Sequence, residues 1–280
     1  LRHRPATISL VVLIILIAYA IVVPVLTGDA YKDPSLRKTW DPPEVVITLD
    51  PLEVVAFAPL GYDEIGQNVF VRLAKATQTS LLIGLAAVLI IAVLGSIIGA
   101  IAGYVGGRTD NLLMRLVDVV LSLPVLFIIL MIVSFFGTGD ISVVIIAIGI
   151  TGWTLAARLI RGEFLTLREM DFVMAARALG VSNRTIMFRH LLPNAMVATM
   201  TFLPFILSSS VMTLTALDFL GFGLPPGSPS LGELLSQGKT NIQAPWLGLA
   251  GFFSVAIMLS LLIFIGEAVR DAFDPRKTFR

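Results

Sequence analysis

The sequence contains no cysteine and only two histidines, His3 and His190. Disulfides, zinc ribbons and thiol chemistry are therefore excluded, and two separate histidines cannot form an imidazole cluster around a metal. We expect no structural metal and no cofactor in this chain.

Charge is scarce as well. Charged residues make up 14% of the 280 residues, hydrophobic residues make up 56%, and the mean hydropathy is +0.92. Such a chain is too apolar to hide its surface in one soluble core, so lipid must surround much of it. The lack of a basic domain argues against a nucleic-acid partner. The net charge of +1 says little about partners, because what matters in a membrane protein is the side on which each charge lies.

Six apolar stretches are long enough to cross about 30 Å of hydrocarbon. They lie near Thr7–Leu26, Thr77–Tyr104, Val117–Phe136, Ile141–Ala157, Ala195–Leu217 and Trp246–Gly266. The sequence thus predicts an all-α integral membrane protein with six transmembrane helices. No small-residue cleavage site follows the first stretch, so we expect a retained span rather than a signal peptide. The chain begins at Leu1 rather than Met, which leaves room for residues upstream.

The basic residues favour one orientation. Most of them fall between the second and third stretches, between the fourth and fifth, and at the two ends. The positive-inside rule therefore predicts that both termini are cytoplasmic.

The loops predicted outside the membrane differ from one another in structure. We divide the chain into residues 1–76, the first helix and an external loop, and residues 77–280, a five-helix core. Five prolines predict that the loop after the first stretch is irregular rather than a folded domain. The pattern from Asp63 to Ala76 fits either a short amphipathic helix or a plain extension of the second span. In the last external loop, Leu231–Gln237 is expected to form one or two helical turns.

Two small-residue patterns lie within the spans. Gly95, Gly99, Gly103 and Gly107 recur every fourth residue, which favours close helix packing over a substrate role. The fifth span carries hydroxyl side chains around Pro204, which fit a polar pathway as well as bonds to helix carbonyls. The candidate pathway residues are Thr201, Ser208, Ser209 and Thr213.

Ionisable residues are absent from the middle of every predicted span, which disfavours an ion-coupled carrier. The string from Gly232 to Thr240 imitates a P-loop, but it has five residues between its glycines where that motif has four, and it lies on the predicted outer face. We therefore expect no ATP site here. No carboxylate pair or nucleophile–base pair suggests a membrane enzyme.

The most polar inner segment, residues 158–194, is predicted to form two short helices. Asp171–Leu179 has helical composition, and Gly180 is placed to end that helix. Ser182 or Asn183 can cap the next helix, and Pro193 opens the following span. Ala175, Ala176 and Gly180 would give the turn a small face that another protein can approach closely.

This segment resembles the coupling loop of ABC import permeases, in Asp171-Phe172-Val173-Met174-Ala175-Ala176-Arg177-Ala178-Leu179-Gly180 and in the later Arg189-His190-Leu191-Leu192-Pro193. Met174 stands where the family motif has Glu. The resemblance implies a type I importer permease whose loop docks on an ATPase subunit. It assigns that role to Asp171, Met174, Ala175, Ala176, Ala178, Leu179, Gly180, Ser182, Arg189 and Pro193.

Further strings resemble the second permease of dipeptide, oligopeptide and nickel importers, and the Yej-type branch in particular. They include Gly61-Tyr62-Asp63 with Arg72, Ala102-Gly103-Tyr104, and Ser228-Pro229-Ser230-Leu231-Gly232-Glu233. The resemblance implies passage of oligopeptides, including the peptide antibiotic microcin C, across a bacterial inner membrane.

The implied partners are a second permease, two ATPase subunits that hold ATP and Mg, and an extracytoplasmic peptide-binding protein. The alternatives are an importer of nickel or another small solute and, from another class, an ion-coupled secondary carrier or channel.

Overall fold

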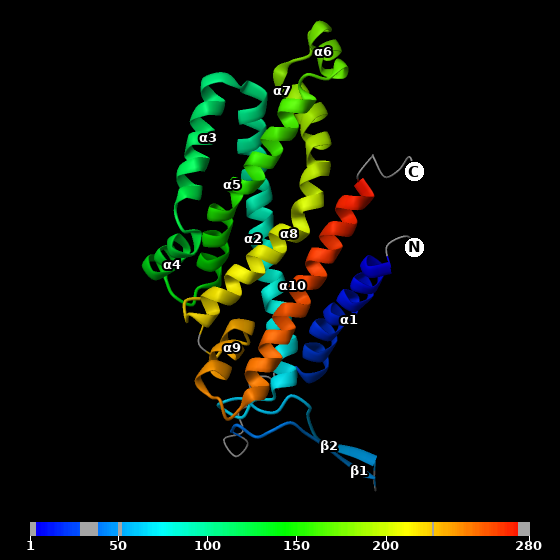
Figure 1. Cartoon of the computed structure of the whole chain (residues 1–280), viewed down its shortest axis with the longest axis vertical. Coiled ribbons are helices and arrows are strands. Elements are labelled where there is room, and N and C mark those ends of the chain that lie inside the picture. Colours follow the sequence, from blue (N-terminus) through cyan, green and yellow to red (C-terminus); the bar gives the residue numbers. More distant parts are fainter. Residues whose placement is uncertain (1–3, 29–38, 50–51, 226, 274–280) are drawn as a thin grey trace. The chain divides into compact units, whose positions relative to one another are not determined.

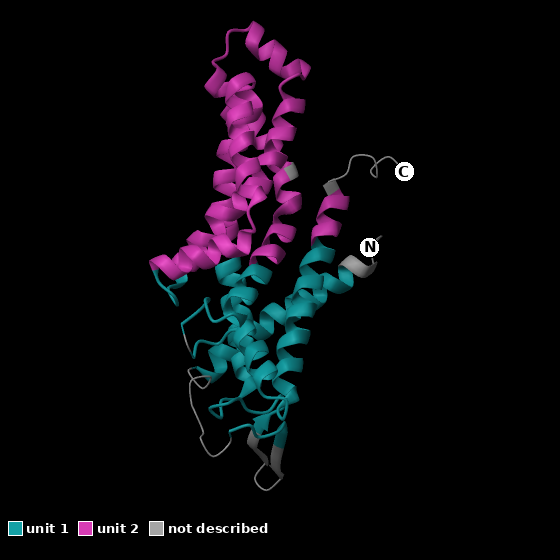
Figure 2. Ribbon diagram, turned by 60° about the vertical axis from the view of Figure 1, so that its left-hand side comes forward, with its two compact units in different colours: residues 1–84, 137–141, 211–265 teal, residues 85–136, 142–210, 266–280 magenta. Residues whose placement is uncertain are grey.

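The computed structural model describes residues 4–28, 39–49, 52–225 and 227–273. These residues form two compact units, each assembled from segments distant in the sequence (Figure 2). Unit 1 comprises residues 1–84, 137–141 and 211–265, and unit 2 comprises residues 85–136, 142–210 and 266–280. The boundary predicted between residues 76 and 77 falls inside a continuous helix.

Five long helices carry the apolar stretches (Figure 1). They are α1 (Arg4–Thr27), α2 (Val69–Val105), α5 (Ile141–Leu167), α8 (Leu192–Phe219) and α10 (Pro245–Phe273). Each is long and apolar enough to span a membrane, so five of the six predicted spans are confirmed. Since α2 begins only at Val69, the stretch from Asp63 to Ala76 is in part an extension of this helix and not a separate one.

The span predicted at Val117–Phe136 is wrong as a single straight helix. The structure has α3 (Gly107–Ser122) and α4 (Val125–Phe136), bent by 84° at the break between them. Leu123 is extended, with φ −93° and ψ 142°, because the ring of Pro124 disfavours helical backbone in the preceding residue. In the part of the chain that the structure describes, a sixth span exists only if this bent pair is counted as one.

The segment 158–194 is more helical than predicted. α5 continues past Ala157 to Leu167, and on this extension Arg158 and Arg161 pair with Asp118 and Asp110 on α3. The two predicted short helices follow as α6 (Asp171–Ala178) and α7 (Asn183–Thr185). A π-helical segment, η2 (Ile186–Leu191), then leads directly into α8.

The segment between the first two spans is not wholly irregular, contrary to the prediction. β1 (Glu44–Leu49) pairs antiparallel with β2 (Leu52–Ala58), with an irregularity between Val46 and Ile47. Both runs contain β-branched residues, which favour strands despite the prolines around them. Pro34 and Pro51 lie outside the described residues.

In unit 2, α2 packs closely on α5. A Cβ added at Gly95 would lie 2.5 Å from the Cβ of Ala156, and one added at Gly99 would lie 2.5 Å from the carbonyl oxygen of Ala157. Gly103 meets Phe164 in the same way. The packing role predicted for these three glycines is confirmed, whereas Gly107 lies beyond the end of α2 with open space around it.

Candidate functional site

The connection between α5 and α8 contains the turn that the sequence predicted as a docking surface. We call residues 171–182 the α6 turn. Gly180 has a φ of +77°, a left-handed conformation that costs glycine little. The amide of Gly180 donates to the carbonyl of Arg177, and the amide of Val181 donates to that of Ala176. This is a Schellman C-cap, so Gly180 ends α6 as predicted.

The chain then restarts as a helix at once. The Ser182 hydroxyl accepts a hydrogen bond from the amide of Thr185, which confirms Ser182 as the N-cap. The hydroxyl of Tyr104, on α2, donates to the side chain of Asn183 at 2.7 Å, and the guanidinium of Arg177 lies 5.6 Å from the Tyr104 ring centroid. Tyr104 therefore contacts both α6, through Arg177, and the start of α7, through Asn183.

The α6 turn is anchored on one side and open on the other. Val173 is fully buried in a cluster with Phe164, Ile186 and Leu191, and Ala176 packs against that cluster. The remaining predicted docking residues are exposed: Asp171, Met174, Ala175, Ala178, Leu179, Gly180, Ser182, Arg189 and Pro193. The structure thus gathers Met174 and Leu179, with exposed fractions of 52% and 83%, on a turn outside the candidate spans.

The hydroxyls predicted to line a pathway differ in exposure. Thr201 and Ser208 are buried, Ser209 is exposed and Thr213 is half-buried. Two other hydroxyls of α8 bond to the preceding turn of the same helix, since Thr199 donates to Ala195 and Thr215 donates to Val211. For Thr199 and Thr215, therefore, the hydroxyl bonds to a carbonyl of its own helix, which is the alternative to lining a polar pathway.

A second site in unit 1 was not predicted as such. Among the described residues Arg72 is the largest fully buried side chain, and its guanidinium bonds to the side chains of Asp63, Gln67 and Glu233. We call these four residues the Arg72 cluster. The cluster joins the segment before α2 to α9 (Leu231–Thr240). The signal in the sequence that could have revealed this cluster is a lone arginine among apolar neighbours at the start of a predicted span, because a buried charge requires partners.

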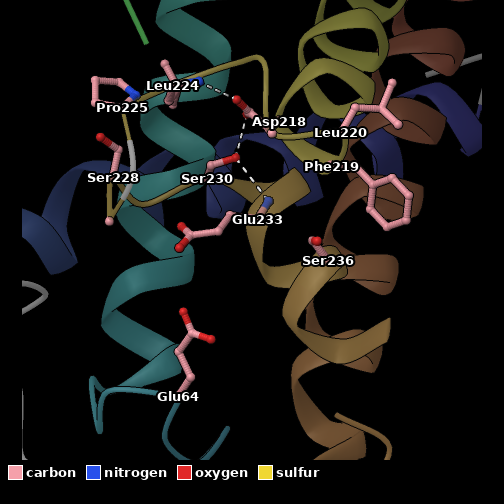
Figure 3. Close-up of a pocket in the computed structure, with 12 residues that line it drawn as sticks. Glu64, Asp218, Phe219, Leu220, Leu224, Pro225, Ser228, Ser230, Glu233 and Ser236 are labelled. Atoms are coloured by element: carbon pink, nitrogen blue, oxygen red, sulfur yellow. Dashed lines mark hydrogen bonds between the residues drawn. The ribbon is translucent and has the colours of Figure 1, made fainter. Parts of the chain in front are cut away.

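A pocket of about 390 Å³ lies beside this cluster (Figure 3). Its lining includes three carboxylates, from Glu64, Asp218 and Glu233, and the hydroxyls of Ser228, Ser230 and Ser236. Asp218 accepts hydrogen bonds from the Ser230 hydroxyl and from the amide of Leu224. Burial raises the pKa of Glu233, while the charge of Arg72 opposes that shift.

The P-loop-like string is a helix rather than a phosphate-binding loop. It forms α9, capped by Ser230, whose hydroxyl accepts from the amide of Glu233. A Cβ at Gly232 would lie 2.2 Å from the carbonyl oxygen of Thr215, and Gly238 packs on Gly248. Both glycines thus allow close packing of α9.

Comparison with known proteins decides the family. Residues 95–279, more than half of the chain, match the model of a protein family described as binding-protein-dependent transport system inner membrane component. The chain belongs to this family. Together with the candidate spans, this membership makes it a multi-pass inner membrane component of a transport system.

Curated relatives agree with the resemblance seen in the sequence. The permease is 55% identical over 251 residues to the inner membrane ABC transporter permease protein YejE of Escherichia coli, covering 90% of this chain and 68% of that one. It is 57% identical over 221 residues to the peptidoglycan transport system permease protein YejE of Agrobacterium fabrum, covering 79% of this chain. The match spans only 58% of the length of the A. fabrum relative.

More distant likenesses extend the pattern. The oligopeptide transport system permease protein OppC of Haemophilus influenzae is 33% identical over 276 residues, which cover 98% of this chain and 86% of that one. Among solved structures, an inward-facing form of the MetNI methionine ABC transporter aligns with a TM-score of 0.61 at 16% identity, covering 72% of this chain and 97% of that one. The predicted fold of a type I importer permease is confirmed.

Proposed function

We propose that this permease is a subunit of an ATP-driven importer of oligopeptides. It forms the translocation pathway with a second, homologous permease, receives cargo from an extracytoplasmic peptide-binding protein, and is driven by two ATPase subunits that carry ATP and Mg. Both termini and the α6 turn face the cytoplasm, in agreement with the distribution of basic residues.

The α6 turn is the observation that supports this proposal. Phe172, Met174 and Leu179 are exposed apolar residues outside the candidate spans, so lipid does not account for them. Exposed apolar groups that cluster in this way mark protein contacts. A groove on an ATPase subunit is the partner that fits the family and the turn.

The packing of the turn supports a mechanism. Val173 joins α6 to residues of α2, α5, η2 and α8 in one buried cluster. A push on the turn from closing ATPase subunits is therefore passed to these helices through the packed side chains of this cluster. Alternating access then requires no ionisable group in the middle of a span.

The names of the relatives support peptides as cargo. They refer to peptidoglycan and oligopeptides, and they give the nickel alternative no support. Thr201, Ser208, Ser209 and Thr213, together with the pocket at Glu64, Asp218 and Glu233, are the residues we propose for contact with the passing peptide.

A purification from gently solubilised membranes tests the proposal. We expect an ATPase and a second permease to accompany this chain, and added oligopeptides to raise the ATPase rate of the assembly. A chain that is recovered alone and still moves solute would instead support an ion-coupled carrier or a channel.

A further inference from the structure

The π-helical segment η2 lies between the α6 turn and α8. The amide of Ile186 donates to the carbonyl of Ser182, four residues back, but the amide of Leu192 donates to that of Met187, five residues back. The helix thus contains one residue more than α-helical spacing requires. Such single-turn insertions occur frequently at functional sites.

The burial pattern shows what the extra residue does. Ile186 and Leu191 are both fully buried in the cluster that holds Val173. In an α-helix, residues five apart point about 140° away from each other, because each residue turns the helix by about 100°. The wider π turn lets both side chains enter the same core while Phe188, between them, stays 56% exposed.

The sequence after η2 fixes the place of this turn. Pro193 has no amide hydrogen, so it cannot restore an α-helical bond to the carbonyl of Arg189. The side chain of Asn194 donates to the carbonyl of His190 at 2.6 Å. Residue 193 donates no main-chain hydrogen bond in either spacing, so a change in register gives up none at that position.

We propose that η2 is a register-shift device that switches between π and α spacing during the transport cycle. The inference rests on the proposed coupling role of the α6 turn and adds how that turn moves. On a switch to α spacing, Ile186 and Leu191 would point about 140° away from each other, so one of them leaves the buried cluster. The part of the chain before η2 then rotates by about 100° and shifts by about 1.5 Å relative to the axis of α8. Movement of the docked turn is thereby converted into rotation at the start of α8.

Deletion of Phe188 tests the device. Removing one exposed residue leaves Ile186 and Leu191 four apart, so both remain in the core and the segment becomes α-helical. We expect the assembly to retain its basal ATPase activity while peptide uptake falls about tenfold or more, a loss within the usual range of coupling between sites. Phe188→Ala keeps the residue count and should transport normally. Normal uptake by the deletion variant would overturn the proposal.

A second measurement uses the chain at its natural length. Because the sequence has no cysteine, spin labels can be placed at Arg184→Cys and Val197→Cys, two exposed positions on either side of η2. We expect the distance distribution in the assembly to change between nucleotide-free and ATP-trapped states. An unchanged distribution would refute the switch even if the deletion variant fails to assemble. Failure of an ATPase to copurify with the unaltered chain would instead refute the proposed function.

Discussion

The carboxylate of Asp63 and the guanidinium of Arg72 form an ion pair in which the side chains are 0% and 1% exposed. The same guanidinium reaches Glu233, whose side chain is 26% exposed. Neutralising one partner of a buried ion pair is costly because the remaining charge stays buried. Loss of the fully buried Asp63 carboxylate should therefore cost more stability than loss of the partly exposed Glu233 carboxylate.

Asp63→Asn should therefore destabilise the protein by about 3–5 kcal/mol. Thermal unfolding of the purified permease in detergent measures this loss. The neighbouring Glu64 is exposed, so Glu64→Gln is the matched control and should change stability by no more than about 0.5 kcal/mol. Equal stability of the two variants would contradict the importance assigned to the Arg72 cluster.

Glu233 should make stability depend on pH. Burial raises its pKa in the folded protein, against the opposing charge of Arg72. Its protonated form is thus favoured by folding, so its contribution is fully present below the ordinary glutamate pKa and is lost as pH rises through the raised value. Between pH 4 and pH 7 the melting temperature of Glu233→Gln should fall less than that of the parent protein, because the variant lacks the carboxyl group that loses its proton. Asp63 is present in both proteins, so its titration does not affect the comparison. An identical pH profile would contradict the assignment.

Gly180→Glu should abolish peptide uptake without preventing membrane insertion. The position has open space around it, so a Cβ there meets no atom of this chain, and the new side chain places bulk and charge on the α6 turn. Its φ of +77° adds strain of about 1 kcal/mol for a residue with a Cβ. Gly180→Asn carries a side chain that tolerates this conformation better and serves as the control for strain. If the Glu variant imports peptide normally, the α6 turn is not the coupling surface.

Gly99→Ala should separate α2 from α5 and lower stability by about 1–3 kcal/mol, the usual cost of overpacking. Its Cβ would lie 2.5 Å from the carbonyl oxygen of Ala157 and 2.9 Å from the Cβ of Ile160, atoms that cannot rotate away. Gly162→Ala is the matched change on an exposed helix position with no atom nearby, and it should stabilise slightly through helix propensity. Chemical denaturation of both variants measures their free energies of unfolding and shows whether Gly99→Ala is the less stable one, as expected.

The sequence predicted most of the membrane part because long apolar runs, glycine spacing and helix caps are local signals. Gly180 and Ser182 end and start helices as their chemistry requires. The bend at Leu123 went unpredicted although Pro124 was visible, because hydropathy continues unbroken across it. The pairing of Arg72 with Glu233 joins residues far apart in the chain, and the extra residue in η2 becomes apparent only from which side chains share a core.

The Schellman cap of the α6 turn has a consequence for partner choice. The carbonyls of Ala175, Ala176 and Arg177 all accept hydrogen bonds from amides of the same turn. Since these three carbonyls already have partners, exposed side chains such as Met174 are what this part of the turn chiefly presents to a protein that would dock there. If the α6 turn has the proposed coupling role, an exchange at Met174 would change which ATPase subunit is accepted while the turn itself stays folded. The two interacting proteins could then diverge together through few substitutions.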